Sequence, residues 1–362
     1  MDIDIIVDAS ITPQQMSELA VEAERLGIRA LWSSSYHQFW DPFLVLAPAA
    51  AATSKILLGP LAISPWERHP LLLANATLSL NELAGGRAMV AVGGGGGVLG
   101  AIGWKADPDG PAWPGYDPVK QIRRPDRRVR GVREGLEVIL LARSGELVMG
   151  YPGEVFDINR PFRMNWASSS GPLVYGACSG PMMIRMGARV ADGVQFSDFT
   201  MPMLPAAMEN VRIGLAKRDQ PAKDFRVGNF WAWHIRKDRD TAFWEARREL
   251  ILRGAVIGKD VEELRRHCHD DDEVQLILDN WKNFLKAWWT RSGQIDGVPE
   301  ELVERLIAGM SSTGDLSDLD REIERYRQFA SAGLTELALR VHDEPMESLK
   351  IIGERVVPAL RD

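Results

Sequence analysis

The glycine run Gly93–Gly97 is the part of the sequence that points most directly to ligand binding. It follows the apolar segment AMVAV (88–92), which is typical of a buried strand. Glycine tolerates φ > 0 and lets another group approach the backbone closely. At the carboxyl end of a parallel strand, where α/β proteins bind ligands, the run predicts room for a flat or phosphorylated ligand. A surface loop without function explains the glycines equally well.

Polar and aromatic side chains follow other apolar segments in the same way. These strand ends are Asp8, Ser33 to His37, Ser64 with Trp66, Ala177 to Ser179, Ser197 with Asp198, and His234. In a parallel barrel such ends share one face, so we expect these side chains to gather around the glycines. Nearby aromatic residues suit a planar ligand, although core packing accounts for some of them: Trp32, Tyr36, Phe39, Trp40, Trp66 and Trp104.

No metal site is expected. His267 and His269 form the one metal-like cluster in the sequence, but residues two apart on a helix face different ways. The two cysteines, Cys178 and Cys268, are far apart and show no metal-binding spacing.

The elements that must position these residues alternate along the chain. Eight apolar, β-rich runs are separated by helical patterns: Ile3–Val7, Ile28–Trp32, Lys55–Ile63, Ala88–Gly93, Leu173–Ala177, Gly193–Ser197, Phe225–Arg236 and Thr335–Arg340. Eight βα units predict an α/β fold with a closed (β/α)8 TIM barrel, built as one domain over residues 1–362 with insertions at about 99–122 and 255–312. A doubly wound open sheet is the alternative, but its dinucleotide fingerprint is missing from the first strand–helix turn.

Composition limits the partners. The net charge of −7 provides no overall basic field, so nucleic acid is not expected as a partner. No stretch approaches the ~20 apolar residues of a transmembrane segment. Residues 1–12 lack the basic region of a signal peptide. The missing signal-peptide region and the two widely separated cysteines together favour a cytoplasmic location.

Four blocks of the sequence resemble the luciferase-like flavin- and deazaflavin-dependent oxidoreductases. They are AERLGIRALWSSSYH (23–37), GPLAISPWERHPLLLANATLSLNELAGGRAMVAVGGG (59–95), GACSGPMMIRMGARVADGV (176–194) and TGDLSDLDREIERYRQFASAGLTELAL (313–339). The second block, with its RHP and GGRA motifs, is the most specific and is similar to the coenzyme F420-dependent branch. That branch includes enzymes like methylenetetrahydromethanopterin reductase.

The resemblance implies a luciferase-like barrel, a homodimer, and a deazaflavin or flavin ring bound at the carboxyl ends of the strands. It also implies a cis non-proline peptide bond within Leu61–Ser64, with Ala62-Ile63 as the best candidate. The cofactor phosphate would meet the start of the helix that follows Gly180. The implied cofactor-binding residues are His37, Ala62, Ile63, Ser64, Gly93, Gly94, Gly95, Cys178, Ser179, Gly180 and Pro181, and the implied substrate-binding residues are Trp40, Trp66, Trp104 and His234.

The sequence departs from the family where an acid commonly follows the glycine strand, because Gly96 and Gly97 stand there. A proton donor or acceptor must then come from elsewhere. His37 is the first candidate, since imidazole exchanges protons near neutral pH. Asp8, Asp198 and His234 are the others. His37 could instead only bond the cofactor.

The expected function is therefore hydride transfer between coenzyme F420 and a small or lipid-like organic substrate. The alternatives are an FMN-dependent two-component monooxygenase of the same family and a non-catalytic homologue that only binds a cofactor. The tryptophan-rich segment Trp281–Trp289 predicts either an apolar lid over the substrate or, somewhat favoured, a dimer face.

Overall fold

A computed structural model of the chain describes residues 1–95, 97–102, 127–252 and 261–361. Trp104 and most of the stretch 99–122 lie outside the described residues, as does part of the expected insertion 255–312. None of the helices within the described ranges combines the length and the apolar character needed to span a membrane.

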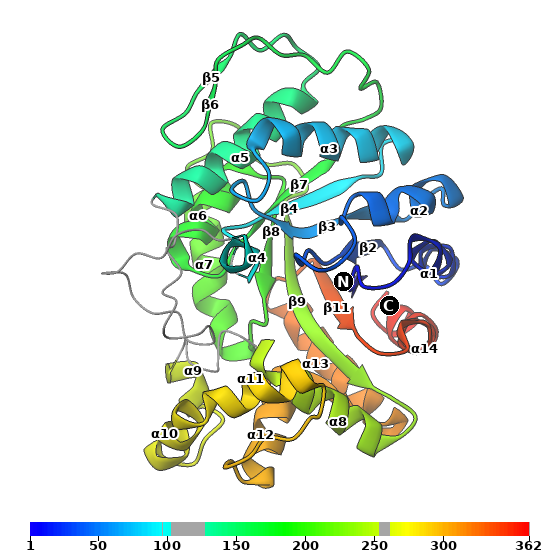
Figure 1. Cartoon of the computed structure of the whole chain (residues 1–362), viewed down its shortest axis with the longest axis vertical. Coiled ribbons are helices and arrows are strands. Elements are labelled where there is room, and N and C mark those ends of the chain that lie inside the picture. The colour runs from blue at the N-terminus through cyan, green and yellow to red at the C-terminus, as the bar shows by residue number, and fades with distance from the viewer. Residues whose placement is uncertain (96, 103–126, 253–260, 362) are drawn as a thin grey trace.

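A closed ring of parallel strands forms the centre of the molecule (Figure 1). Strand order is β11-β1-β2-β3-β4-β7-β8-β9, and β9 pairs with both β8 and β11 to close the ring. The eight strands are β1 (Asp2–Val7), β2 (Ala30–Ser33), β3 (Leu57–Ile63), β4 (Met89–Val92), β7 (Leu173–Ala177), β8 (Gly193–Ser197), β9 (Arg226–Ile235) and β11 (Glu336–Val341). The predicted (β/α)8 barrel is confirmed, and each strand coincides with one of the eight apolar runs.

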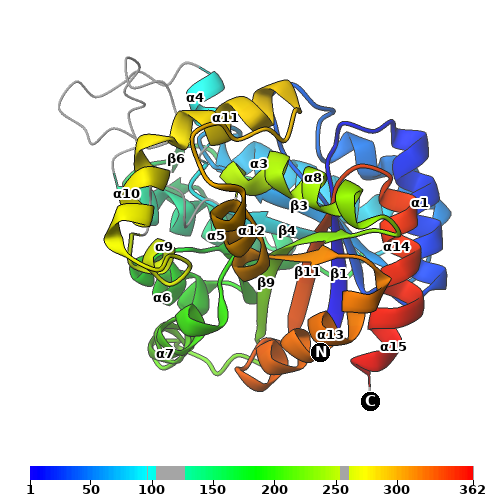
Figure 2. The same cartoon turned by 90° about the horizontal axis from the view of Figure 1, so that it is seen from below.

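Helices surround the ring, and α1 and α14, from opposite ends of the chain, lie side by side in both views (Figures 1 and 2). The helices are α1 (Pro13–Arg25), α2 (Ala47–Ala52), α3 (Pro70–Leu83), α4 (Gly97–Ala101), α5 (Arg128–Arg143), α6 (Pro181–Val190), α7 (Leu204–Leu215), α8 (Arg239–Glu249), α9 (Val261–Arg265), α10 (Asp271–Asp279), α11 (Trp281–Thr290), α12 (Glu300–Met310), α13 (Leu319–Ser331), α14 (Pro345–Ile351) and α15 (Val357–Ala359). Several begin as their sequences predict: Thr12 forms a capping box with Gln15, and proline opens α3 and α6.

Local elements differ from the sequence expectation in three places. The sequence predicts a helical segment over 261–291, whereas the structure has three helices there, with breaks after Arg265 and at Asn280. The sequence 146–156 predicts a hairpin with Tyr151-Pro-Gly at its centre. The structure pairs β5 (Tyr151–Pro152) with β6 (Asp157–Ile158), so the turn begins at Gly153. Strand β10 (Ser311–Gly314) was not expected, because SSTG lacks the apolar residues that mark a strand.

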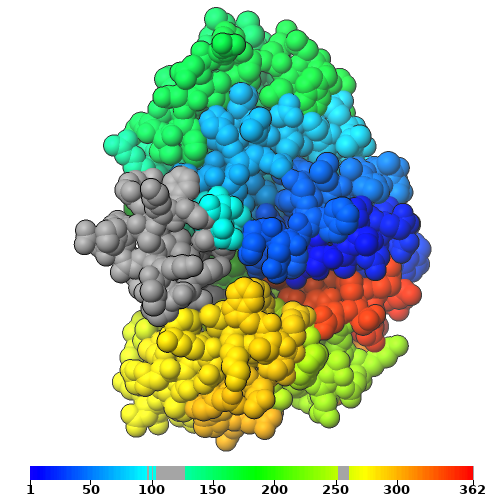
Figure 3. Space-filling view, in the orientation of Figure 1, coloured from blue at the N-terminus to red at the C-terminus, as the bar shows by residue number. Residues whose placement is uncertain are grey.

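Strand β10 extends the sheet outside the ring, along the carboxyl half of the long strand β9. Next to it, α8 to α12 enclose a second hydrophobic core, separate from the one between the barrel and its outer helices. Its buried residues include Leu250, Ile277, Phe284 and Leu306. In Figure 3 the segments α9 to α12, coloured yellow and orange, form one continuous body against the barrel.

The amino-terminal half of the barrel interior is closed by charged side chains. Arg29 Nη2 lies 2.5 Å from Asp4 Oδ2 and 3.1 Å from Glu336 Oε1, and both acids are fully buried. Trp32 Nε1 donates a hydrogen bond of 2.9 Å to Asp4. Burial raises the pKa of Asp4, and the Arg29 charge counteracts that rise. The guanidinium therefore offsets part of the cost of burying these acids inside the ring.

Replacing Arg29 by methionine leaves Asp4 without its cationic partner, whereas Glu336 keeps its ion pair with Arg226. We expect Arg29→Met to lower the free energy of unfolding at pH 7 by about 3–5 kcal/mol, the usual cost of breaking a buried ion pair. The loss should shrink as the pH falls, because the unpaired Asp4 carboxyl then becomes protonated. Chemical denaturation at several pH values measures both effects.

Arg25→Met is the matched control, because Arg25 pairs with Glu22 at the surface, with most of its own side chain exposed. It should change stability by no more than about 0.5 kcal/mol. Equal losses of unfolding free energy in the two variants would show that the buried ion pair stabilises the fold no more than the surface pair does.

Candidate active site at the carboxyl ends of the strands

The carboxyl ends of β3, β4 and β7 meet around very small side chains. A Cβ added to Gly93 would lie 3.1 Å from the Cβ of Ala177 and 3.5 Å from that of Ala62. The Gly93 amide donates to Ile63 O at 2.9 Å and so ties the ends of β3 and β4 together. This arrangement leaves the wall at Gly93 free of bulky side chains, as a flat ligand would require, while the Arg128 guanidinium lies against the next residue, Gly94.

A cis peptide bond joins Leu61 and Ala62 in this wall. The prediction of a cis non-proline bond within Leu61–Ser64 is confirmed. The specific choice of Ala62-Ile63 is wrong, because the cis bond lies one residue earlier.

The loop after β3 folds back onto the glycine run. Ser64 is buried, and its carbonyl accepts the amides of Glu67 at 3.0 Å and Arg68 at 3.1 Å. Gly95 has φ +59°, and a Cβ there would lie 2.6 Å from Ser64 Cβ and 3.0 Å from Glu67 Oε1. The Glu67 carboxyl therefore lies directly beside the glycine backbone.

Glu67 was not among the residues selected from the sequence. Burial raises its pKa to about 7, against the smaller lowering effects of the Ser64 amide and the Arg68 charge. The sequence offered one usable signal, a carboxyl between the end of a strand and the RHP motif. Its partial burial, however, depends on the contact with Gly95, and hydrophobic periodicity in the sequence does not predict that contact.

Helix α6 begins at this same edge with an open amino terminus. Gly180 is its N-cap (φ −101°, ψ 156°), no side chain caps the helix, and a Cβ at Gly180 would meet nothing within 4 Å. Ser179, Gly180 and Pro181 are exposed. The first-turn amides and the positive end of the helix dipole are therefore accessible to an anion.

Cys178 is less available than its neighbours. Its amide donates to Gln195 O at 2.9 Å, and its thiol donates to Met183 O at 3.2 Å. The side chain is buried, which raises the pKa of the thiol. Cys178 thus joins β7 to β8 and α6, and only the residues after it face solvent.

A cavity of about 430 Å³ opens beside β1 and β11. Its lining combines aromatic and charged side chains: Val7, Asp8, Ser10, Ile11, Tyr36, Gln38, Phe39, Glu249, Trp288, Trp289, Arg291, Arg340, Val341, His342, Asp343, Glu344 and Pro345. Arg340 Nη2 lies 2.8 Å from Asp8 Oδ1. Burial opposes the charge on Arg340, but Asp8, Tyr36 and Glu249 together outweigh this effect, so the pKa of Arg340 stays above its ordinary value.

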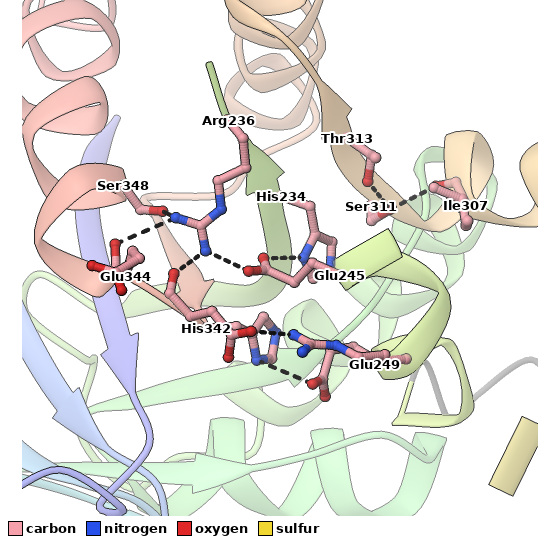
Figure 4. Close-up of polar contacts among 12 residues, drawn as sticks. His234, Arg236, Glu245, Glu249, Ile307, Ser311, Thr313, His342, Glu344 and Ser348 are labelled. Carbon is pink, nitrogen blue, oxygen red and sulfur yellow. Dashed lines mark hydrogen bonds and ion pairs between the residues drawn. The ribbon is translucent and has the colours of Figure 1, made fainter. Parts of the chain in front are cut away.

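Behind one wall of the cavity lies a buried network on β9 and α8 (Figure 4). His234 Nδ1 is 2.8 Å from Glu245 Oε1, and Arg236 also pairs with Glu245. The His234 ring stacks on that of His342, with centroids 5.0 Å apart. Because His342 lines the cavity and His234 is only 1% exposed, His234 supports the lining from behind instead of forming it.

The predicted proton-transfer residues lie in different surroundings. Asp8 lines the cavity in its ion pair with Arg340. His37 is exposed on the loop after β2, and its neighbours Tyr36 and Gln38 line the cavity. Asp198 is 2% exposed, has φ +57° and accepts a hydrogen bond of 3.0 Å from the Ser197 hydroxyl. It does not line the described cavity.

The predicted substrate-binding tryptophans are not brought together. The Trp66 ring packs against Phe156, with centroids 5.5 Å apart, and lies against Gly131 of α5. That contact directs Trp66 toward α5 and the β5–β6 hairpin and away from the cavity. Trp40 is 50% exposed next to the cavity-lining Phe39. The tryptophans that do line the cavity are Trp288 and Trp289, which sequence analysis placed on a lid or a dimer face.

Comparison with known proteins places this geometry in context. The family model described as luciferase-like monooxygenase matches residues 3–336. The 5,10-methylenetetrahydromethanopterin reductase of Archaeoglobus fulgidus is 27% identical over 342 residues, 94% of this chain and 93% of that protein. The F420-dependent glucose-6-phosphate dehydrogenase of Nakamurella multipartita is 25% identical, over 96% of this chain and 93% of that protein.

The same fold occurs in the solved structure of the coenzyme F420-dependent tetrahydromethanopterin reductase from Methanopyrus kandleri. The two structures superpose with a TM-score of 0.75 at 22% identity, over 99% of each chain.

The close approach of Gly95 to Ser64 is testable by adding one methyl group. Alanine at φ +59° carries a left-handed backbone cost of about 1–2 kcal/mol. Crowding against Ser64 should add about 1–3 kcal/mol. Gly145→Ala is the control, because Gly145 has φ +72° but open space around its Cβ. Chemical denaturation should therefore show a larger loss for Gly95→Ala, and equal losses would mean that the two loops do not pack tightly.

Proposed function

Because the chain belongs to the luciferase-like monooxygenase family, we propose that it is an oxidoreductase that transfers a hydride between coenzyme F420 and a small organic substrate. The observation that carries this proposal is similarity along almost the whole chain to F420-dependent enzymes with different substrates. Because these enzymes share the cofactor but act on different substrates, the similarity supports the cofactor assignment more strongly than it supports any one substrate. A homodimer, which the sequence resemblance implies, is part of the proposal.

The residues present fit such a cofactor. The small residues Ala62, Gly93 and Ala177 leave a wall against which a flat ring can lie. The open amino terminus of α6 at Gly180 offers amides to its phosphate. When bound, F420 supplies the hydride acceptor or donor. The protein binds and orients the reactants and excludes water.

The cavity beside β1 and β11 is our candidate substrate site. Its volume of about 430 Å³ falls within the range of small-ligand pockets. Tyr36, Phe39, Trp288 and Trp289 provide apolar surface, while the Asp8–Arg340 pair provides polar contacts. This lining favours a small molecule that carries both apolar and polar groups over a purely lipid-like chain.

Fluorescence titration tests the cofactor assignment. We expect purified protein to quench F420 fluorescence on binding and to show no comparable affinity for FMN. Tight FMN binding without any effect on F420 would contradict the proposal and support a flavin-dependent monooxygenase.

The role of the α6 amino terminus is tested by introducing a negative charge there. Gly180→Asp should weaken F420 binding about 5- to 30-fold, because a charge at a helix terminus is worth about 1–2 kcal/mol. Folding should be retained, since the site has open space and aspartate is a favourable N-cap. Gly180→Asn is the matched control: it has the same size without the charge, and it should bind F420 within a few-fold of the original protein. Equal affinities for the two variants would place the phosphate elsewhere.

A further inference from the structure

Among the described residues where β3, β4 and β7 end, Glu67 has the carboxyl group that faces the glycine wall. Its Oε1 lies 3.0 Å from the position of a Cβ on Gly95, and that same position is 2.7 Å from Ser64 Oγ. The described part of the glycine run itself contains no ionisable side chain. Glu67 thus brings an acid to a wall that otherwise consists of backbone, small side chains and the Arg128 guanidinium, which lies against Gly94.

The charged groups around Glu67 are directed elsewhere. Arg68 turns to Asp41, with Nη2 and Oδ2 2.5 Å apart, and lies over the Phe43 ring. On α5, Arg128 Nε donates to Gly94 O at 3.1 Å. Neither interaction engages the Glu67 carboxyl. Burial raises the pKa of Glu67 to about 7, so the group exchanges a proton near neutral pH.

Two other ionisable groups near this wall are less suited to that exchange. Cys178 is buried with its thiol on Met183 O, and burial raises its pKa. His69 lies on the outer side of the loop, where its Nδ1 accepts the Leu71 amide at the start of α3. His37, the residue favoured from the sequence, is exposed on a different loop.

We propose that Glu67 is the proton-exchanging group of the cofactor site, and this inference rests on the proposed F420-dependent function. In substrate oxidation, two electrons leave the substrate carbon as a hydride, which the cofactor accepts. Glu67 does not line the candidate substrate cavity. The proton released when the substrate O–H or N–H bond breaks therefore passes through water and forms a new O–H bond on the Glu67 carboxylate. Water then removes that proton. Substrate reduction uses the same steps in reverse.

The first test needs no cofactor and compares Glu67→Gln with the original protein across pH. An acid whose pKa is about 7 in the folded protein and near 4.5 when unfolded stabilises the fold below pH 4.5. That contribution is lost as the pH rises through 7. The Tm of Glu67→Gln relative to the original protein should therefore rise by a few degrees between pH 5 and pH 8. Glu146→Gln, at an exposed position after α5, should show no such trend.

The second test measures proton uptake when F420 binds, by calorimetry at pH 7.5 in two buffers of different ionisation enthalpy. The anionic cofactor beside Glu67 disfavours the carboxylate, so binding should take up roughly half a proton per site. Glu67→Gln should lose this uptake while binding F420 within a few-fold, and His37→Asn should retain it.

These outcomes separate the two proposals. If F420 binds and proton uptake is the same in Glu67→Gln, the inference about Glu67 is wrong while the cofactor assignment stands. Loss of proton uptake in His37→Asn instead of in Glu67→Gln would also overturn the inference about Glu67. If F420 does not bind the original protein at all, the proposed function fails, whatever the pH dependence of Tm shows.

Discussion

Closure of the parallel sheet between β8 and β9 is the constraint on which the rest of the structure depends. Since every strand of the ring runs in the same direction, closure brings all eight carboxyl ends to one rim. Residues as distant in sequence as Asp8 and Arg340 become ion-pair partners there. The amino-terminal half of the interior is filled differently, by the salt-bridge cluster around Arg29. Stability and ligand binding therefore use opposite ends of one barrel.

The rim divides into two halves of different chemistry. Around β3, β4 and β7 the walls are made of Ala62, Gly93 and Ala177, where backbone dominates. Around β1 and β11 the walls are aromatic and charged, and they border the cavity. A ring-shaped cofactor on the first half and a variable substrate on the second would meet near the middle of the rim, where hydride transfer requires them to touch. Glu67 reaches the first half from the loop that follows β3.

The barrel could be predicted from sequence because parallel strands buried on both faces read as continuous apolar runs. Strand β10 escaped prediction since its polar residues are satisfied by tertiary contacts: Ser312 Oγ bonds Glu322 and Tyr326. The start of α6 was predictable from Gly180-Pro181, a local signal. Glu67 and Trp66 were not, although they are adjacent. The Glu67 side chain lies against Gly95 and the Trp66 ring lies against α5. These orientations depend on how the loop packs in the folded protein.

The second hydrophobic core holds in place the helix that forms one wall of the cavity. Phe284 anchors α11 in that core, while Trp288 and Trp289 of the same helix line the cavity. Substitutions that reshape this wall therefore change packing among helices α8 to α12. Within such an architecture, descendants of one ancestral gene could acquire new substrates by changing residues 261–310, with the cofactor half inherited intact.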